Sequence, residues 1–210
     1  MLATFDEDIN LHTASTPGSM IEAMGLATWS EGRIQQRWGG GETGVVTLGW
    51  NQDQPARYTI RLLGDAQIDP DGELIFSLAD ALNDPPMKGK NQGAPATGAQ
   101  AMRQPIDLTV ALLDAAGQEA RLPLSTRMPV QPQIVVDVWK APLFNARVKS
   151  EAVLQSYAFA LSEFAAANPA FDPAQIRAVG FIFNRTPIGS VLLDGVGFRA
   201  QSDPIVESNR

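Results

Sequence analysis

Carboxylates near the two ends of the chain are the first residues whose types could do chemistry. Asp6, Glu7 and Asp8 follow one another near the N-terminus, and Asp194 lies in an otherwise apolar or small run near the C-terminus. A buried carboxylate needs a partner, because an unpaired charge inside a protein is costly. Calcium takes roughly six to eight oxygen ligands from carboxylates, backbone carbonyls and water. If the first and last strands lie side by side, these four acids therefore predict a structural calcium site.

Two alternatives to calcium stay open from the same residues. The three N-terminal acids are also typical of a solvated strand end. Asp194 could instead cap a turn or pair with Arg185. The calcium hypothesis further needs backbone carbonyl ligands, for which the loop over residues 15–19 is the candidate.

Tryptophan side chains indicate a second kind of chemistry, because an exposed indole can stack on the flat face of a sugar. Trp38 lies in a loop-like, glycine-rich stretch over residues 35–41 and is expected to be exposed. Trp139 alternates with Asp137, so these two side chains share one face of a strand. The other large aromatic residues near strand signals are expected to fill the core: Trp29, Trp50 and Tyr58.

Catalysis finds little support in the residues. A Ser-His-Asp triad would have to use His12, the only histidine, and no Gly-x-Ser-x-Gly motif surrounds any serine. Acids are numerous enough for a glycosidase pair, but nothing marks two of them as opposed across a cleft. The run Gly39-Gly40-Gly41 is not followed by a predicted helix, so it is not a phosphate loop.

Composition excludes several classes of protein. The chain has 210 residues and no cysteine, which excludes disulfides, thiolate zinc sites and a cysteine nucleophile. Its net charge of −7 and the lack of a basic cluster argue against nucleic acid and anionic membranes as partners. No apolar run is long enough for a transmembrane helix. The N-terminus has no signal-peptide pattern, and we expect the natural chain to continue upstream of Met1.

Strand signals dominate the chain, separated by turns rich in Gly, Pro, Asp and Asn. The alternation of Tyr58, Ile60 and Leu62 is the clearest. Strands are predicted over residues 3–11, 26–31, 45–50, 57–63, 73–78, 106–113, 120–124, 134–138, 155–161, 178–184 and 190–198.

Only one helix is predicted, over residues 162–167, with Ser162 as its N-cap and Asn168-Pro169 as its end. A single turn is expected at 172–175, capped by Asp172. Turns are predicted at 69–72 and 114–117. We expect one β-sandwich domain over residues 1–200, with a long mobile loop at about 83–104 and a frayed tail at 201–210.

The C-terminal half resembles galactose-binding-like jelly-roll domains, a form that many carbohydrate-binding modules have. The resemblance rests on residues 153–164, on Phe171-Asp172-Pro173, on residues 176–183 and on residues 191–198. The chain is also similar to the β-sandwich domain found C-terminal to bacterial secreted α/β hydrolases, and the similarity spans about residues 4–199. It departs from the pattern in one respect, since Asp194-Gly195 stands where the closing strand usually has Asp-Asp.

The resemblance implies an all-β jelly-roll sandwich and a non-catalytic accessory domain that binds a polysaccharide or oligosaccharide for an attached, secreted bacterial hydrolase. It implies a ligand on the concave sheet face or at the loop rim, near Trp38, Arg61, Asp137 and Trp139. It also implies calcium between the first and last strands, with Asp194 as the ligand that carries over directly. A structural domain that only stabilises its catalytic neighbour is one alternative, and a hydrolase in its own right is another.

Overall fold

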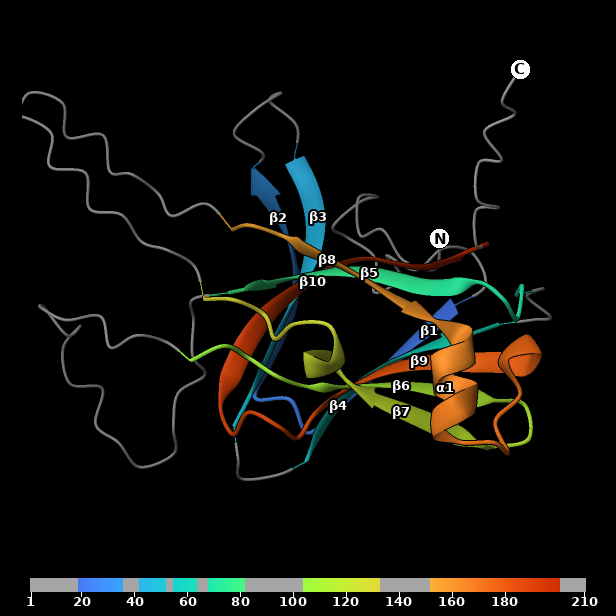
Figure 1. Ribbon diagram of the computed structural model, residues 1–210. Helices are drawn as coiled ribbons and strands as arrows, with labels where there is room; N and C mark the ends of the chain where they lie inside the picture. The colour runs from blue at the N-terminus through green and yellow to red at the C-terminus, as the bar shows by residue number, and fades with distance from the viewer. Residues whose placement is uncertain are drawn as a thin grey trace, which may run out of the picture.

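The protein is a sandwich of two sheets. The computed structural model describes residues 19–35, 42–51, 55–63, 68–81, 104–132 and 152–200. These residues form two five-stranded antiparallel sheets that pack face to face, with a short α-helix beside them (Figure 1). The predicted all-β jelly-roll sandwich is therefore confirmed.

The first sheet has the strand order β1-β4-β9-β6-β7. Its strands, in that order, are β1 (Ser19–Met24), β4 (Ala56–Leu62), β9 (Ile176–Phe183), β6 (Thr109–Asp114) and β7 (Glu119–Pro123). The second sheet has the order β2-β3-β10-β5-β8. Its strands are β2 (Thr28–Gln35), β3 (Glu42–Trp50), β10 (Gly189–Arg199), β5 (Glu73–Asp80) and β8 (Gln155–Ala160). β1 and β2 follow each other in the chain, and each is an edge strand of its sheet.

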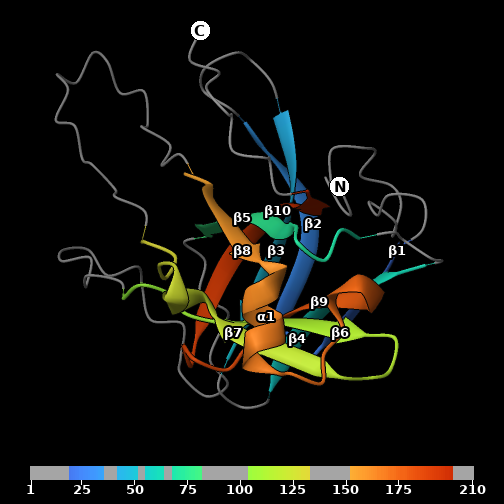
Figure 2. The same cartoon turned by 45° about the vertical axis from the view of Figure 1, so that its right-hand side comes forward.

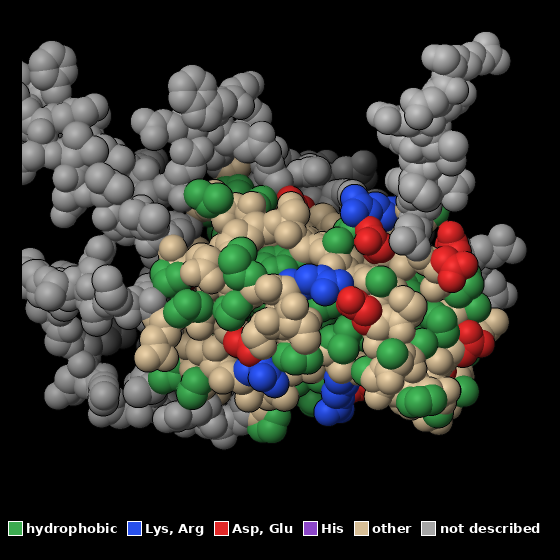
Figure 3. Space-filling model, in the orientation of Figure 1, with side chains coloured by type: hydrophobic (Ala, Val, Ile, Leu, Met, Phe, Trp, Pro, Cys, Tyr) green, Lys and Arg blue, Asp and Glu red, His purple; other side chains and the backbone are tan. Residues whose placement is uncertain are grey.

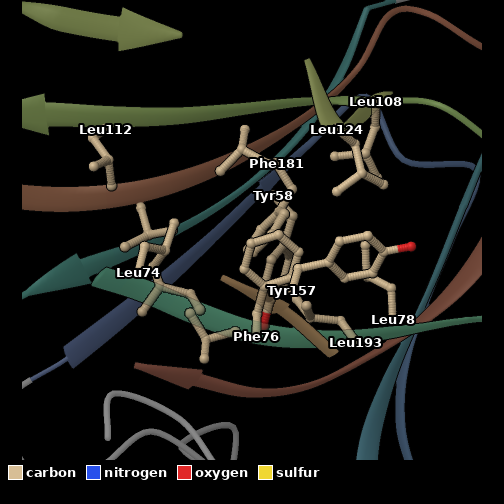
Figure 4. Packing of buried hydrophobic residues seen from close by; sticks show 14 of the residues in the cluster. Tyr58, Leu74, Phe76, Leu78, Leu108, Leu112, Leu124, Tyr157, Phe181 and Leu193 are labelled. Atoms are coloured by element: carbon tan, nitrogen blue, oxygen red, sulfur yellow. The ribbon is translucent and has the colours of Figure 1, made fainter. Parts of the chain in front are cut away.

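Side chains that alternate along the strands fill the space between the sheets. Phe76 of β5 stands near the centre, with the rings of Tyr157 and Phe181 at 5.3 and 5.1 Å from its own (Figure 4). Trp50 closes one end of the core, since its ring stacks on Phe183 at 4.3 Å and its indole N–H donates to the Thr186 carbonyl at 2.7 Å. Burial of apolar surface stabilises a fold by about 25 cal/mol per Å², and these rings belong to one continuous apolar core of aliphatic and aromatic side chains.

Helix α1 (Leu161–Ala167) lies against β7 (Figures 1 and 2). It buries Leu161 and Phe164, which are three residues apart and share one face of the helix. Its N-cap is Ala160, so the prediction of Ser162 as the cap is wrong. The short 3-10 helix η3 (Pro173–Gln175) begins as predicted, because the Asp172 carboxylate accepts a hydrogen bond from the Ala174 N–H at 2.9 Å. A second 3-10 helix, η1 (Leu124–Thr126), follows β7.

The hairpin between β6 and β7 is held by a buried carboxylate. One oxygen of Asp114 accepts hydrogen bonds from the N–H groups of Ala116 and Gln118, at 2.9 and 2.8 Å. Its other oxygen accepts from the Asp172 N–H at 3.0 Å. Asp114 therefore joins the predicted turn to the segment before η3.

Most predicted strands are found within one to three residues of their expected ends. The strand β1 was not predicted. The expected strands at 3–11 and 134–138, most of the loop at 83–104 and the tail at 201–210 lie outside the described residues. In the part of the chain that the structure describes, no helix is long and apolar enough to cross a membrane.

Candidate functional site

Trp29 is the aromatic residue that the structure leaves most accessible among those it describes. It keeps 40% of its surface exposed, whereas Trp50, Tyr58 and Tyr157 are buried. Trp50 and Tyr58 fill the core as predicted, but the expectation that Trp29 does so is wrong. The reason is its place in the sheet, because β2 is an edge strand with a neighbour on one side only. An inward-facing side chain on such a strand covers the rim of the core and stays half open.

Register shows which way the β2 side chains face. Trp29 pairs with Leu48 of β3, and Glu31 pairs with Val46. Paired residues of neighbouring strands share a face. Leu48 and Val46 are fully buried in the core between the sheets. Trp29 and Glu31 therefore stand side by side on the inward face of β2, about 7 Å apart along the strand.

Tyr58 lies beneath this pair, on β4 of the opposite sheet. Burial raises the pKa of its hydroxyl above the ordinary value, and the negative charge of Glu31 raises it further. The Trp29 side chain approaches the hydroxyl as a hydrogen-bonding group, and this contact lowers the pKa of Tyr58. That approach stops short of a well-formed hydrogen bond, since the buried hydroxyl oxygen has no partner at hydrogen-bonding geometry. We call these three residues, Trp29, Glu31 and Tyr58, the edge site.

The edge site combines two features that can bind a sugar, although the Oε1 atom of Glu31 is buried. A flat indole face can cover the C–H face of a pyranose ring, and a carboxylate can accept hydrogen bonds from its hydroxyl groups. The alternative is purely structural, with Trp29 closing the rim of the core over Tyr58. A single carboxylate beside an indole gives no pair of catalytic groups, so the arrangement is suited to binding rather than to bond cleavage.

The structure places Arg61 elsewhere. It lies on the outer face of the first sheet, where its Nε donates to Glu22 of β1 at 2.7 Å. That ion pair, acting first through its hydrogen bond, raises the pKa of Arg61. Arg61 and the edge site therefore do not belong to one surface, and its role as a ligand contact stays a prediction.

The same outer face carries a second ion-pair network. Arg57 of β4 reaches Glu119 of β7 at 2.8 Å, and Arg121 binds the other oxygen of Glu119. Arg57 lies across Gly180 of β9, where an added Cβ would come within 2.7 Å of the guanidinium. The arginines of this face are thus held by neighbouring acids.

The face shown in Figure 3 has the same character. Its charged side chains occur as a few neighbouring blue and red groups, separated by apolar and neutral ones. Neither the ion-paired outer face of the first sheet nor the face in Figure 3 shows a patch of one charge sign that would attract a charged polymer.

Of the four predicted calcium ligands, the structure describes only Asp194. Asp194 is half-buried on β10, paired in register with Ser77 just before a bulge at which Gly195 has φ of +61°. Arg185, the alternative partner named above, binds Asp107. Within the described ranges, no three His, Asp or Glu side chains cluster closely enough to hold a metal ion.

Several predicted site residues lie outside the described residues. They are the remaining calcium candidates Asp6, Glu7 and Asp8, the predicted sugar contacts Trp38, Asp137 and Trp139, and the sole histidine His12.

Comparison with solved structures defines the class of fold. An exo-β-agarase matches with a TM-score of 0.58 at 9% identity, over 97% of this chain and 25% of that chain. A family 30 carbohydrate-binding module of the cellulosomal cellulase Cel9D-Cel44B of Clostridium thermocellum matches with a TM-score of 0.53 at 12% identity, over 90% of this chain and 95% of that chain. A further family 30 carbohydrate-binding module gives 0.51 at 12% identity, over 88% and 91% of the two chains.

These likenesses confirm the predicted fold. The chain is a β-sandwich of the jelly-roll type, and it has the fold of carbohydrate-binding modules over nearly the whole length of the family 30 structures. It spans about a quarter of the agarase. No family model matches the chain, and no curated protein matches it.

Proposed function

We propose that this domain binds carbohydrate without catalysing a reaction, as an accessory module of a hydrolase. The observation that carries the proposal is the half-exposed indole of Trp29 beside the Glu31 carboxylate, on a fold shared with carbohydrate-binding modules. Trp38, Asp137, Trp139 and Arg61 are proposed as further contacts, on the strength of the sequence alone.

The attached enzyme is proposed to be a secreted bacterial glycoside hydrolase. The likeness to a quarter of an exo-β-agarase supports such an arrangement, because a region of this fold there belongs to a much longer enzyme. It also makes agarose a ligand to test first. An extracellular location is part of the same proposal, since polysaccharides such as agarose are found outside the cell.

Binding to a defined panel tests the proposal. Isothermal titration calorimetry would use neoagarohexaose, cellohexaose and laminarihexaose, and affinity electrophoresis would use agarose and soluble β-glucans. We expect saturable binding of at least one of these ligands. A protein that is folded by circular dichroism but binds none of them would contradict the proposal.

A structural calcium ion is proposed as part of this function. The donor set fits, because Asp194 and the three N-terminal acids offer only oxygen ligands, which calcium prefers. The residues that would hold it are Asp6, Glu7, Asp8 and Asp194. Calcium should raise the melting temperature of the wild type but not that of Asp194→Asn, and equal shifts in both proteins would remove Asp194 from the site.

A second candidate is an interaction domain that stabilises a catalytic neighbour without binding a glycan. Met20 and Met24, on the outer side of edge strand β1, favour it because they are 45% and 65% exposed. This candidate predicts no binding to the panel. The third candidate, a hydrolase in its own right, predicts release of reducing ends from the panel that is lost on His12→Ala.

A further inference from the structure

Tyr58 presents a polar group that the fold leaves unsatisfied. Its side chain is fully buried, yet its hydroxyl oxygen has no hydrogen-bond partner. An orphaned buried hydroxyl costs a protein stability, and such groups in native structures need an explanation. Phenylalanine would fill the same space between the sheets without this cost.

The neighbours of the hydroxyl give that explanation. Tyr58 faces Trp29, which is 40% exposed, and Glu31, which is partly buried and whose Oε1 lies away from solvent. The hydroxyl can accept a hydrogen bond from the indole N–H or donate one to the carboxylate. In the free protein the hydroxyl completes neither bond.

We propose that Tyr58 is a positioning residue of the edge site, whose hydroxyl completes its hydrogen bonds only when a sugar covers Trp29. A pyranose ring stacked on the outer face of the indole presses it inward, toward the hydroxyl beneath. A sugar hydroxyl bound to Glu31 at the same time fixes the carboxylate in the same place. Side-chain rotamer changes are common where a binding partner docks. This inference rests on the proposed function, and it adds that the edge site takes one uncharged pyranose unit with indole and carboxylate acting together.

The proposal predicts that removing the Tyr58 hydroxyl raises the stability of the free protein but weakens its affinity for sugar. Tyr58→Phe removes a hydroxyl that is unpaired in the free protein, so the free protein should melt higher, by about 2–4 °C. The same change removes a hydrogen bond from the complex, so Kd should rise about 3–10-fold. A purely structural tyrosine would move the two quantities together or leave affinity alone.

Tyr157 supplies a matched control, since the chain has only two tyrosines. It is also buried, but it lies on β8, the opposite edge of the second sheet from β2, and its hydroxyl points away from the packed rings (Figure 4). Its hydroxyl already has a long contact with Gln155 at 3.5 Å. Tyr157→Phe should therefore leave Kd unchanged within about twofold and should not raise the melting temperature.

The experiment measures melting temperature and Kd for the wild type, Tyr58→Phe and Tyr157→Phe, with the three hexasaccharides of the panel. A higher melting temperature together with a 3–10-fold weaker Kd, in Tyr58→Phe alone, is the expected result. Unchanged affinity in Tyr58→Phe, with binding by the wild type intact, would overturn the inference and leave the proposed function standing. If the wild type binds neither the three hexasaccharides nor the polysaccharides of the panel, both fall.

Discussion

Replacing Trp29 with alanine is the perturbation whose effect the structure lets us size. The indole leaves 40% of its surface to solvent. A tryptophan side chain carries roughly 250 Å² of surface, so a sugar ring stacked on it can cover about 100 Å². At about 25 cal/mol per Å² this corresponds to about 2.5 kcal/mol, or roughly a 60-fold weaker Kd in Trp29→Ala.

The same substitution also costs stability, which has to be separated from the loss of binding. The buried part of the indole covers the rim of the core, and its loss should lower the free energy of unfolding by about 3–4 kcal/mol. Trp29→Phe keeps a smaller ring at the same place and should weaken binding by only about 3–5-fold. Met24→Ala, on the outer face of β1, is the control for an exposed side chain outside the site and should bind like the wild type.

Calorimetric titration with the tightest hexasaccharide, run below the melting temperature of every variant, measures the effect. Circular dichroism establishes that each variant is folded. A folded Trp29→Ala protein with wild-type affinity would refute the reasoning, because the exposed indole would then contribute no contact area to the complex.

Three further predictions concern groups that hold the fold. Asp114→Asn should lower the free energy of unfolding by about 1–2 kcal/mol and Asp114→Ala by about 3–4 kcal/mol, and urea titration that finds the two variants equal would contradict its three hydrogen bonds. Burial alone would raise the pKa of Glu119, but hydrogen bonds from Arg57 and Arg121 lower it below the ordinary 4.5. Its stabilising contribution is therefore present above pH 4.5 and is lost as the pH falls through the lower folded value, so Glu119→Gln should flatten the acid limb of stability against pH. Burial raises the pKa of Tyr157 to about 12, so the contribution of its neutral hydroxyl to stability is full below pH 10 and is lost as the pH rises from 10 toward 12. Absorbance at 295 nm should therefore show no phenolate near pH 10 while the protein is folded.

Local signals in the sequence account for most of the fold. The alternation of Tyr58, Ile60 and Leu62 predicted β4, and the Asp-Pro pair at 172–173 predicted the start of η3. β1 escaped prediction because its most exposed side chains, Met20 and Met24, are apolar, so its pattern does not separate a buried from a solvated face.

The helix cap shows the limit of such signals. Ser162 is a good N-cap residue, yet the helix begins at Leu161 directly after β8, where burial of Leu161 and Phe164 decides the boundary. Packing of an apolar face contributes more to a seven-residue helix than its cap does.

The edge site could not be read from the sequence. Trp29 and Trp50 both lie in strands, and only long-range pairing puts β2 at an edge and β3 inside the second sheet. Tyr58 joins the site across the sandwich, a contact between sheets that no local pattern records. The sequence did indicate sugar-stacking tryptophans as a class, and the prediction for Trp38 and Trp139 stays open to test.

The most direct test of the account is to observe the tryptophan indole N–H signals by ¹H–¹⁵N NMR while the tightest glycan of the panel is added. The chain has four tryptophans, and Trp29→Phe assigns the signal that matters. The account predicts that the Trp29 signal shifts with the ligand, whereas that of Trp50, buried and bonded to the Thr186 carbonyl, stays in place. A glycan that binds and leaves the Trp29 signal unmoved would contradict the claim that the edge site is where this domain meets carbohydrate.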